Sequence, residues 1–129
     1  MRQIRAFFTD TTIRVYQAYC HEIADKALQA QAFVPPFKME RMTWIKPSFL
    51  WMMYRSGWGT KSGQERILAV DLLRDGFEWA LAHACLTHYD PVVYASQEDW
   101  ALTKAESPVR VQWDPDRSPT MELLEYVGE

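Results

Sequence analysis

The middle of the chain combines aromatic rings with cations and hydroxyl groups. The stretch Arg41–Gly59 reads RMTWIKPSFLWMMYRSGWG. With an upstream strand, it supplies the candidate ligand-binding set Tyr16, Gln17, Tyr19, Lys46, Ser48, Trp51, Tyr54 and Arg55. Flat aromatic faces can stack on a base or a nicotinamide, and cations can hold a pair of phosphates. The mixture predicts a nucleotide-like ligand. The alternative is that the rings fill the core while the cations stay in solvent.

Several familiar catalytic and metal-binding signatures are absent. The sequence contains no GxGxxG after a strand, no GxxxxGK[ST], no CxxC and no HExxH. Cys85 and His88 offer only two ligands, fewer than a metal site needs, so no metal is expected. No GxSxG elbow surrounds Ser48 and no histidine lies near it in sequence. Its residue type favours a bond to backbone or to a ligand oxygen.

The elements that must position these groups form an irregular series. Strands are predicted at 2–8, 12–19, 67–73 and 109–113, and helices at 22–31, 77–88 and 96–104. A central helix should begin at Lys46-Pro47 and end at Gly57 and Gly59. Residues 121–127 fit either a helical turn or a strand. Since strands and helices do not alternate regularly, we expect an α+β fold. It should be one compact mixed domain whose central, mostly antiparallel sheet, continuous or split, is flanked by helices.

Periodicity also places individual side chains. In the 12–19 strand, Gln17 shares a face with Ile13 and Val15, so its amide needs hydrogen-bond partners; without them its burial costs about 1–3 kcal/mol. The aliphatic run 67–73 predicts a buried strand. Spacings of three and four predict one buried helical face, formed by Phe77, Ala80, Leu81, Ala84, Cys85 and His88. Ser96 followed by Asp99 resembles a capping box.

Size and charge restrict the class of protein. The chain has 129 residues, 48% of them hydrophobic, and a formal charge of −3. This composition predicts a packed single domain and argues against charge-driven binding to nucleic acid. No secretory signal and no run of about 20 apolar residues is present, so we expect no membrane insertion. A cytoplasmic location with Cys20 and Cys85 as free thiols follows as the expectation.

The motifs also carry a family resemblance. RQIRA, IRVYQAY, FVPPFKMERMTWIKPSFLWMMYRSGWGTK, GQERILAVDL and SPVRVQWDPDR resemble the family catalogued as domain of unknown function 4291. The resemblance covers about 1–117, which we predict to be the globular domain. Members of the family continue past the QWDP motif, whereas 118–129 reads as a short acidic tail. If that difference leaves a sheet edge or core uncovered, the chain should form a homodimer.

A more distant likeness is to the ADP-ribosyltransferase group, which binds NAD in the notch of a split sheet. This likeness implies an enzyme that cleaves NAD or transfers ADP-ribose. Gln17, Ser48 and Asp114 would be catalytic, with Asp114 stabilising positive charge on the sugar. NAD would be bound by the remaining candidates, Tyr16, Tyr19, Lys46, Trp51, Tyr54, Arg55 and Gln112. The competing hypothesis is a non-catalytic module that binds a nucleotide or a protein.

Overall fold

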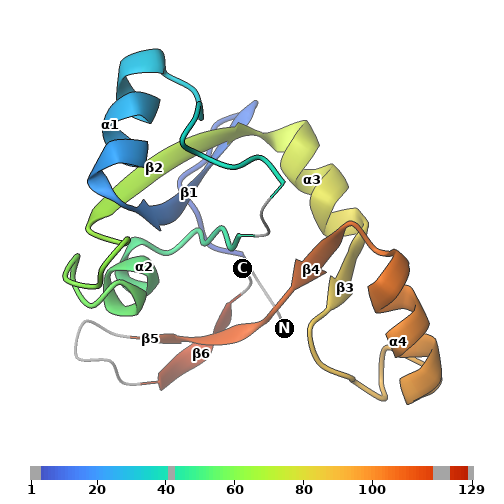
Figure 1. The fold of residues 1–129 in the computed structure, drawn as a ribbon. Helices are drawn as coiled ribbons and strands as arrows, with labels where there is room; N and C mark the ends of the chain where they lie inside the picture. The colour runs from blue at the N-terminus through green and yellow to red at the C-terminus, as the bar shows by residue number, and fades with distance from the viewer. Residues whose placement is uncertain (1–3, 41–42, 118–122, 128–129) are drawn as a thin grey trace. The chain divides into compact units, whose positions relative to one another are not determined.

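The computed structural model describes residues 4–40, 43–117 and 123–127, with the backbone course alone in 114–117 and 123–127. Its elements follow the chain in the order β1 (Thr12–Tyr19), α1 (His21–Ala30), α2 (Phe49–Arg55), β2 (Arg66–Leu73), α3 (Arg74–Ala82), β3 (Ala84–Leu86), α4 (Gln97–Glu106), β4 (Val109–Val111), β5 (Asp114–Arg117) and β6 (Leu123–Val127) (Figure 1). The described strands form three two-stranded sheets, β1-β2, β3-β4 and β5-β6. The predicted α+β class is therefore confirmed.

The chain forms two units. The central-segment unit is Arg14–Asp71, and the terminal-segment unit combines Met1–Ile13 with Leu72–Glu129. Each unit has its own secondary structure and is described separately below. The sequence-based domain limits of 1–117 and 118–129 stay predictions.

The sheet of the central-segment unit is built on β1. Its predicted limits are confirmed, and the predicted alternation holds, since Val15 and Gln17 are buried. On one edge β1 pairs with β2. At its other edge, Tyr16 N donates to the Lys46 carbonyl at 2.7 Å and Lys46 N donates to the Tyr16 carbonyl at 3.3 Å. The segment that enters α2 is thereby fixed to β1 by backbone bonds.

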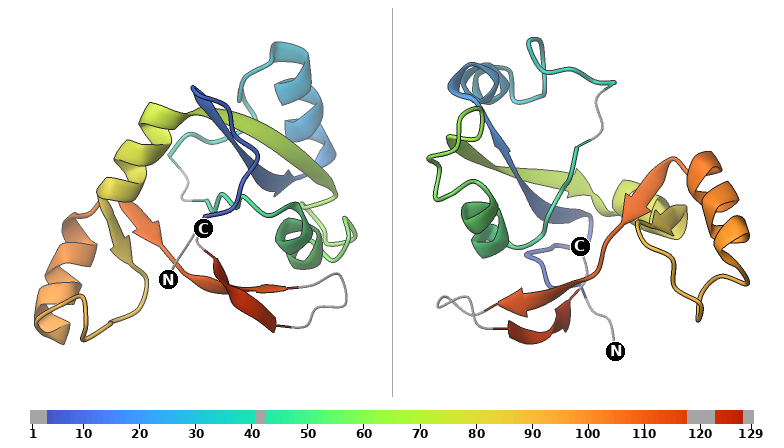
Figure 2. Two further views of the ribbon diagram at one scale, coloured as in Figure 1. Left: turned by 180° about the vertical axis from the view of Figure 1, so that it is seen from behind. Right: turned by 60° about the horizontal axis from the view of Figure 1, so that its bottom comes forward.

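Two helices accompany this sheet. The sheet passes between α1 and α2 in all three ribbon views (Figures 1 and 2). α1 confirms the helix predicted at 22–31; it ends at Ala30, and the next residue, Gln31, caps it with a left-handed φ of 53°. α2 begins at Phe49, so the prediction that Lys46-Pro47 opens this helix was wrong. Lys46 is held extended by its bridge to Tyr16, which moves the helix start beyond Ser48.

The terminal-segment unit contains a parallel strand pair. β3 and β4 pair in the register Ala84 with Val109, Cys85 with Arg110 and Leu86 with Val111. α4 connects the two strands and lies beside β3 (Figure 2). Ser96 caps α4 by accepting from Asp99 N at 3.1 Å, which confirms the predicted cap. β4 confirms the strand at 109–113 but ends at Val111.

The helix predicted over 77–88 was wrong in both limits and burial. α3 begins at Arg74 and ends at Ala82, and none of its residues is buried. Ala84 and Cys85 belong to β3 instead, where Cys85 is fully buried. Their spacing mimics a helical face, but pairing with β4, more than twenty residues further on, determines the local structure.

Three smaller differences concern strands. Within 4–8 the structure has only an isolated bridge between Phe8 and Ile13, so the described part of the strand predicted at 2–8 is absent. β2 confirms the strand at 67–73, but of its eight residues only Leu68 is buried. β6 selects the strand alternative for 121–127; it pairs antiparallel with β5, Asp114 facing Val127.

Candidate ligand-binding cavity

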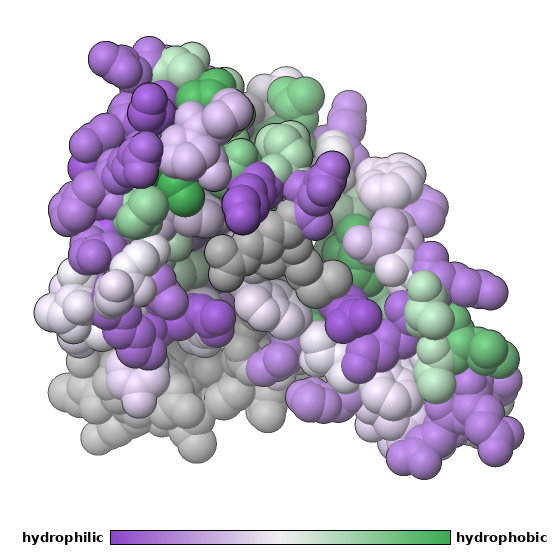
Figure 3. Space-filling model, viewed as in Figure 1, coloured by the Kyte–Doolittle hydropathy of each residue, from purple (hydrophilic) through white to green (hydrophobic). Residues whose placement is uncertain are grey.

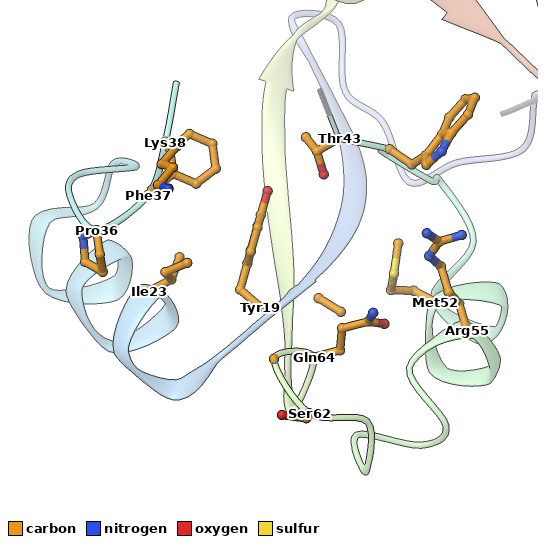
Figure 4. A pocket seen from close by; sticks show the side chains of 13 residues that line it. Tyr19, Ile23, Pro36, Phe37, Lys38, Thr43, Met52, Arg55, Ser62 and Gln64 are labelled. Carbon is orange, nitrogen blue, oxygen red and sulfur yellow. The ribbon is translucent and has the colours of Figure 1, made fainter. Parts of the chain in front are cut away.

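The end of β1, both helices and two loops of the central-segment unit enclose a cavity of about 710 Å³ (Figure 4). It is lined by Ala18, Tyr19, Ile23, Pro36, Phe37, Lys38, Thr43, Trp44, Met52, Arg55, Ser62, Gly63 and Gln64. Figure 4 shows Tyr19 projecting from β1 between Phe37 on one side and Met52 on the other. This size lies in the range of about 300–1,000 Å³ that small-molecule sites occupy.

The charged groups at the cavity are basic. Lys38 lies in the loop after α1, and Arg55 is the last residue of α2. Among the described residues that line the cavity, none carries a carboxylate; Glu65 follows Gln64 in sequence but does not line it. The remaining polar lining is uncharged and comes from Tyr19, Thr43, Ser62 and Gln64. The arrangement favours an anionic ligand over a cationic one.

Arg55 is held by the indole of Trp51. The Arg55 guanidinium carbon lies 5.4 Å from the ring centroid, and Lys46 Nζ lies 4.8 Å from the same centroid. Both distances are within cation–π range. Lys46 is only 2% exposed, so its contact with Trp51 is shielded from water. Trp51 does not line the cavity; it supports a cation that does.

Gln17 and Ser48 are both engaged by the backbone. Gln17 is 5% exposed, and its Nε2 donates to the Trp44 carbonyl at 3.3 Å, which confirms that this buried amide has a partner. Ser48 is the N-cap of α2, and its Oγ accepts from Trp51 N at 3.1 Å. Each residue therefore positions cavity-wall elements, Trp44 in one case and α2 in the other.

Tyr19 is enclosed by rings. Its ring meets Phe33 and Phe37 edge to face, with centroids 5.7 and 5.6 Å away, and those two phenylalanines stack at 4.4 Å. The Tyr19 hydroxyl is shielded from solvent and has no hydrogen-bond partner among the described residues. Tyr16 packs its ring edge against Phe49 at 5.4 Å and does not line the cavity.

A tight turn with left-handed backbone angles leads into the part of the cavity wall that Ser62, Gly63 and Gln64 form. Gly57, Trp58 and Gly59 have φ values of 60°, 58° and 76°. Ser56, which is fully buried, holds this turn: its Oγ donates to the Met53 carbonyl and accepts from Gly59 N. The Ser56 carbonyl also accepts from Thr60 N and Lys61 N. The chain then runs into Ser62, Gly63 and Gln64 at the cavity.

The predicted site residues thus divide into groups. Tyr19 and Arg55 line the cavity, while Tyr16, Gln17, Lys46, Ser48 and Trp51 support its walls. Tyr54 is 56% exposed and does not line it. Sequence reasoning missed Lys38, Thr43, Ser62 and Gln64 as lining residues. Trp44 was inside the quoted aromatic stretch, but no pattern distinguished it from the other rings.

Gln112 and Asp114 belong to the terminal-segment unit. Gln112 lines that unit's cavity of about 300 Å³, together with Thr87 and His88, and its Oε1 accepts from Thr87 Oγ1 at 3.5 Å. Asp114 begins β5, but its side chain lies outside the described part of the structure.

The buried thiol of Cys85 meets the half-buried phenol of Tyr94 elsewhere in the terminal-segment unit. Cys85 Sγ lies 3.2 Å from the Tyr94 hydroxyl, which also accepts from Leu86 N at 3.0 Å. Burial, followed by the hydrogen bond with Cys85, raises the pKa of Tyr94. Cys20 and Cys85 are both free thiols, as predicted.

Over the described residues, no group of three or more His, Cys, Asp and Glu side chains could hold a metal ion. None of the helices described there is long and apolar enough to cross a membrane.

Comparison with known proteins identifies the family. Neither the curated proteins nor the solved structures contain a match to this chain. One family model, described as a domain of unknown function (DUF4291), matches residues 3–128. The match extends beyond the 1–117 range traced from the motifs and includes β5 and β6. Because it covers nearly the whole chain, the protein belongs to the DUF4291 family.

Proposed function

We propose that the central-segment unit binds an anionic, nucleotide-like small molecule in the cavity lined by Tyr19, Lys38 and Arg55. One observation carries this proposal: two cations, one from the loop after α1 and one from α2, line a cavity of about 710 Å³ without any carboxylate among its described lining residues. A ligand with a phosphate group would offset the positive charge that this wall concentrates.

Arg55 is the group best suited to bind the phosphate. A guanidinium presents its N–H donors in a rigid fork that matches two phosphate oxygens. The face of Trp51, 5.4 Å away, supports that fork and reduces the orientational freedom lost on binding. Lys38 would contribute a second, more flexible charge.

Aromatic side chains supply the surface for a heterocycle. Tyr19, Phe37 and Trp44 all line the same cavity as the two cations. Rings of this kind stack on nucleobases, which adds affinity without requiring one base. Rings and cations together at one cavity distinguish a nucleotide-like ligand from a simple anion.

Binding without catalysis is the function that the geometry supports best. The side chains of Gln17 and Ser48, predicted as catalytic, are used to hold Trp44 and α2. NAD as a cofactor and an ADP-ribosyltransferase-like activity stay proposals, and the binding experiment includes both. The expected cytoplasmic location likewise stays a prediction.

The test is ligand-dependent thermal stabilisation with AMP, ADP, ATP and NAD, followed by calorimetric titration of those that stabilise. A ligand that binds only the folded state at 100 times its Kd stabilises the protein by about 2.7 kcal/mol. Combined Lys38→Ala and Arg55→Ala substitution should weaken binding at least tenfold. Lys26→Ala is the matched control, because Lys26 is an exposed cation of α1 that does not line the cavity.

Two outcomes would contradict the proposal. The first is the absence of stabilisation by every nucleotide at millimolar concentration. The second is equal weakening by the Lys26→Ala control and the cavity double variant. Nicotinamide release from NAD, measured in the same mixtures, tests the enzymatic alternative; release that the cavity double variant abolishes would favour it.

We separately propose that two copies of the chain associate, because several apolar side chains of the terminal-segment unit are exposed. Val92 is 91% exposed, and Leu102 on α4 and Trp79 on α3 are also exposed. Apolar surface is visible over α4 (Figure 3). Exposed apolar area of this kind is often covered by another protein surface. Sedimentation at low micromolar concentration distinguishes the predicted homodimer from a monomer.

A further inference from the structure

Trp58 has a backbone conformation that is rare for a bulky residue. Its φ is 58°, in the left-handed region, where the side chain of an L-residue crowds the backbone. Trp58 N donates to the Met53 carbonyl at 2.7 Å, and Gly57 N donates to the Tyr54 carbonyl at 3.0 Å. This pair of bonds is the common glycine-type ending of a helix, in which the residue at the position of Gly57 takes the left-handed conformation. The ending therefore explains the positive φ of Gly57 but not that of Trp58.

The exposure of Trp58 gives a second reason to look for a function. Its side chain is 58% exposed, and that of Tyr54, one helical turn earlier, is 56% exposed. The bonds at the end of α2 keep the two residues close along the chain. Backbone strain gathers at functional sites, and tryptophan and tyrosine are enriched among the residues that contribute most to binding. A strained and exposed tryptophan therefore marks this turn as an interaction surface.

The charges of the surrounding segment restrict the partner. Residues 41–64 contain four cations and no aspartate or glutamate, although acidic residues outnumber basic ones in the whole chain by 17 to 14. Arg55 and Lys61, on either side of Trp58 in sequence, are both exposed. The Lys61 side chain lies against Gly57, since a Cβ built there would meet Lys61 Cγ at 3.5 Å. Charge complementarity therefore favours an anionic partner.

The rings select among anionic partners. Bases of a single-stranded nucleic acid stack on aromatic side chains, and cations beside the rings bind the phosphates between them. A duplex conceals the faces of its bases, and an acidic peptide uses the cations but has no bases to stack on the rings. Because the whole chain has a formal charge of −3, few phosphate contacts are expected, and the bound strand should be short.

We propose that Trp58 and Tyr54, together with Arg55 and Lys61, form a surface that binds a short single-stranded nucleic acid. The two rings stack on bases, and the two cations bind the neighbouring phosphates. This inference goes beyond the proposed function and does not depend on it, because Tyr54, Trp58 and Lys61 do not line the cavity.

The test is fluorescence anisotropy with labelled oligouridylate and oligothymidylate of about eight nucleotides. Trp58→Gly and Tyr54→Ala should each weaken binding at least about fivefold, the lower limit for loss of one stacked base. Lys61→Glu should weaken binding and reduce its dependence on salt. Trp79→Ala is the matched control and should change the affinity less than twofold. Trp79 is a similarly exposed tryptophan, but it follows Glu78 on α3 and belongs to the other unit.

A conservative variant separates binding from a role in folding. Glycine adopts a φ of 58° without strain, whereas tyrosine keeps a stacking ring and the strain. Trp58→Tyr should therefore retain binding to within about threefold, while Trp58→Gly loses it. The Tm of Trp58→Gly, followed by far-UV circular dichroism, should be at least that of Trp58→Tyr. If Trp58 only stabilised the turn, affinity and Tm would instead change in the same order.

The outcomes also separate this inference from the proposed function. Failure of both oligonucleotides to bind, or binding that Trp58→Gly leaves intact, would overturn the strand-binding surface. Preferred binding to the matching duplex or to phosphatidylserine vesicles would overturn it as well. AMP, titrated into the same variants, should bind Trp58→Gly as it binds the unchanged chain. Failure of every mononucleotide to bind would overturn the proposed function and leave a demonstrated strand-binding surface standing.

Discussion

The side-chain amide of Gln17 donates a hydrogen bond to the main-chain carbonyl of Trp44 at 3.3 Å, joining β1 to the segment that lines the cavity. The sequence places the polar amide of Gln17 among apolar side chains, so it was expected to need a hydrogen-bond partner. The Trp44 carbonyl is that partner. It is a backbone group 27 residues away, which no local pattern indicates.

Gln17→Leu is expected to destabilise the protein by about 1–3 kcal/mol, because the Trp44 carbonyl loses its donor in a partly buried place. Urea denaturation measures the change. Binding should weaken only indirectly, through the displaced cavity wall. An unchanged midpoint combined with loss of NAD cleavage would instead assign Gln17 a catalytic role.

Ser48→Ala is expected to destabilise the protein by about 1 kcal/mol, because α2 loses the side chain that accepts from Trp51 N. Ser48→Asp should retain most of the stability, since a carboxylate also accepts there and favours a helix N-terminus. Chemical denaturation of both variants tests this. Equal losses for alanine and aspartate would contradict the capping role.

Gly59→Ala should destabilise the protein more than Gly63→Ala. Both glycines have positive φ, 76° and 81°, which costs an L-residue about 1–2 kcal/mol. A Cβ at Gly59 would also lie 3.2 Å from the Glu65 carbonyl oxygen, whereas Gly63 has open space. Denaturation midpoints give the order, and the reverse order would contradict this account of the turn.

The pair between Arg14 and Asp71 predicts a dependence of stability on pH. Arg14 Nε donates to Asp71 Oδ1 at 2.8 Å, and Nη2 donates to Oδ2 at 3.0 Å. The hydrogen bond with Arg14 lowers the pKa of Asp71 from its ordinary value of 3.8. A carboxyl whose pKa is lower in the folded state stabilises the fold above the unfolded pKa and loses that contribution as pH falls through the folded pKa.

A double-mutant cycle of Arg14→Gln and Asp71→Asn, followed by Tm, checks this expectation. Coupling should be present at pH 7, disappear below the folded pKa of Asp71, and weaken with added salt. It should be small, because the two side chains are 35% and 48% exposed. Coupling that persists at strongly acidic pH would contradict the ionic account.

Local sequence patterns succeeded where neighbours along the chain decide the structure. The alternation in TIRVYQAY determined β1, and the cap at Ser96 determined where α4 begins. Each signal depends on side chains within a few residues. The α+β class followed from the order of such segments, because strands and helices in irregular order do not build a regular parallel sheet.

Contacts between residues far apart in sequence decided those parts of the fold and of the candidate site that local patterns did not predict. Cys85 and Ala84 were expected on a helical face, yet β3 forms because β4 offers it backbone partners. The Lys46 bridge to Tyr16 likewise delays α2 and leaves Ser48 as its cap. The sequence by itself determined which residue types a nucleotide-like site would need. Only tertiary structure decided that Arg55 and Tyr19 share a cavity with Lys38 and Gln64, because residues so far apart in sequence meet only through folding.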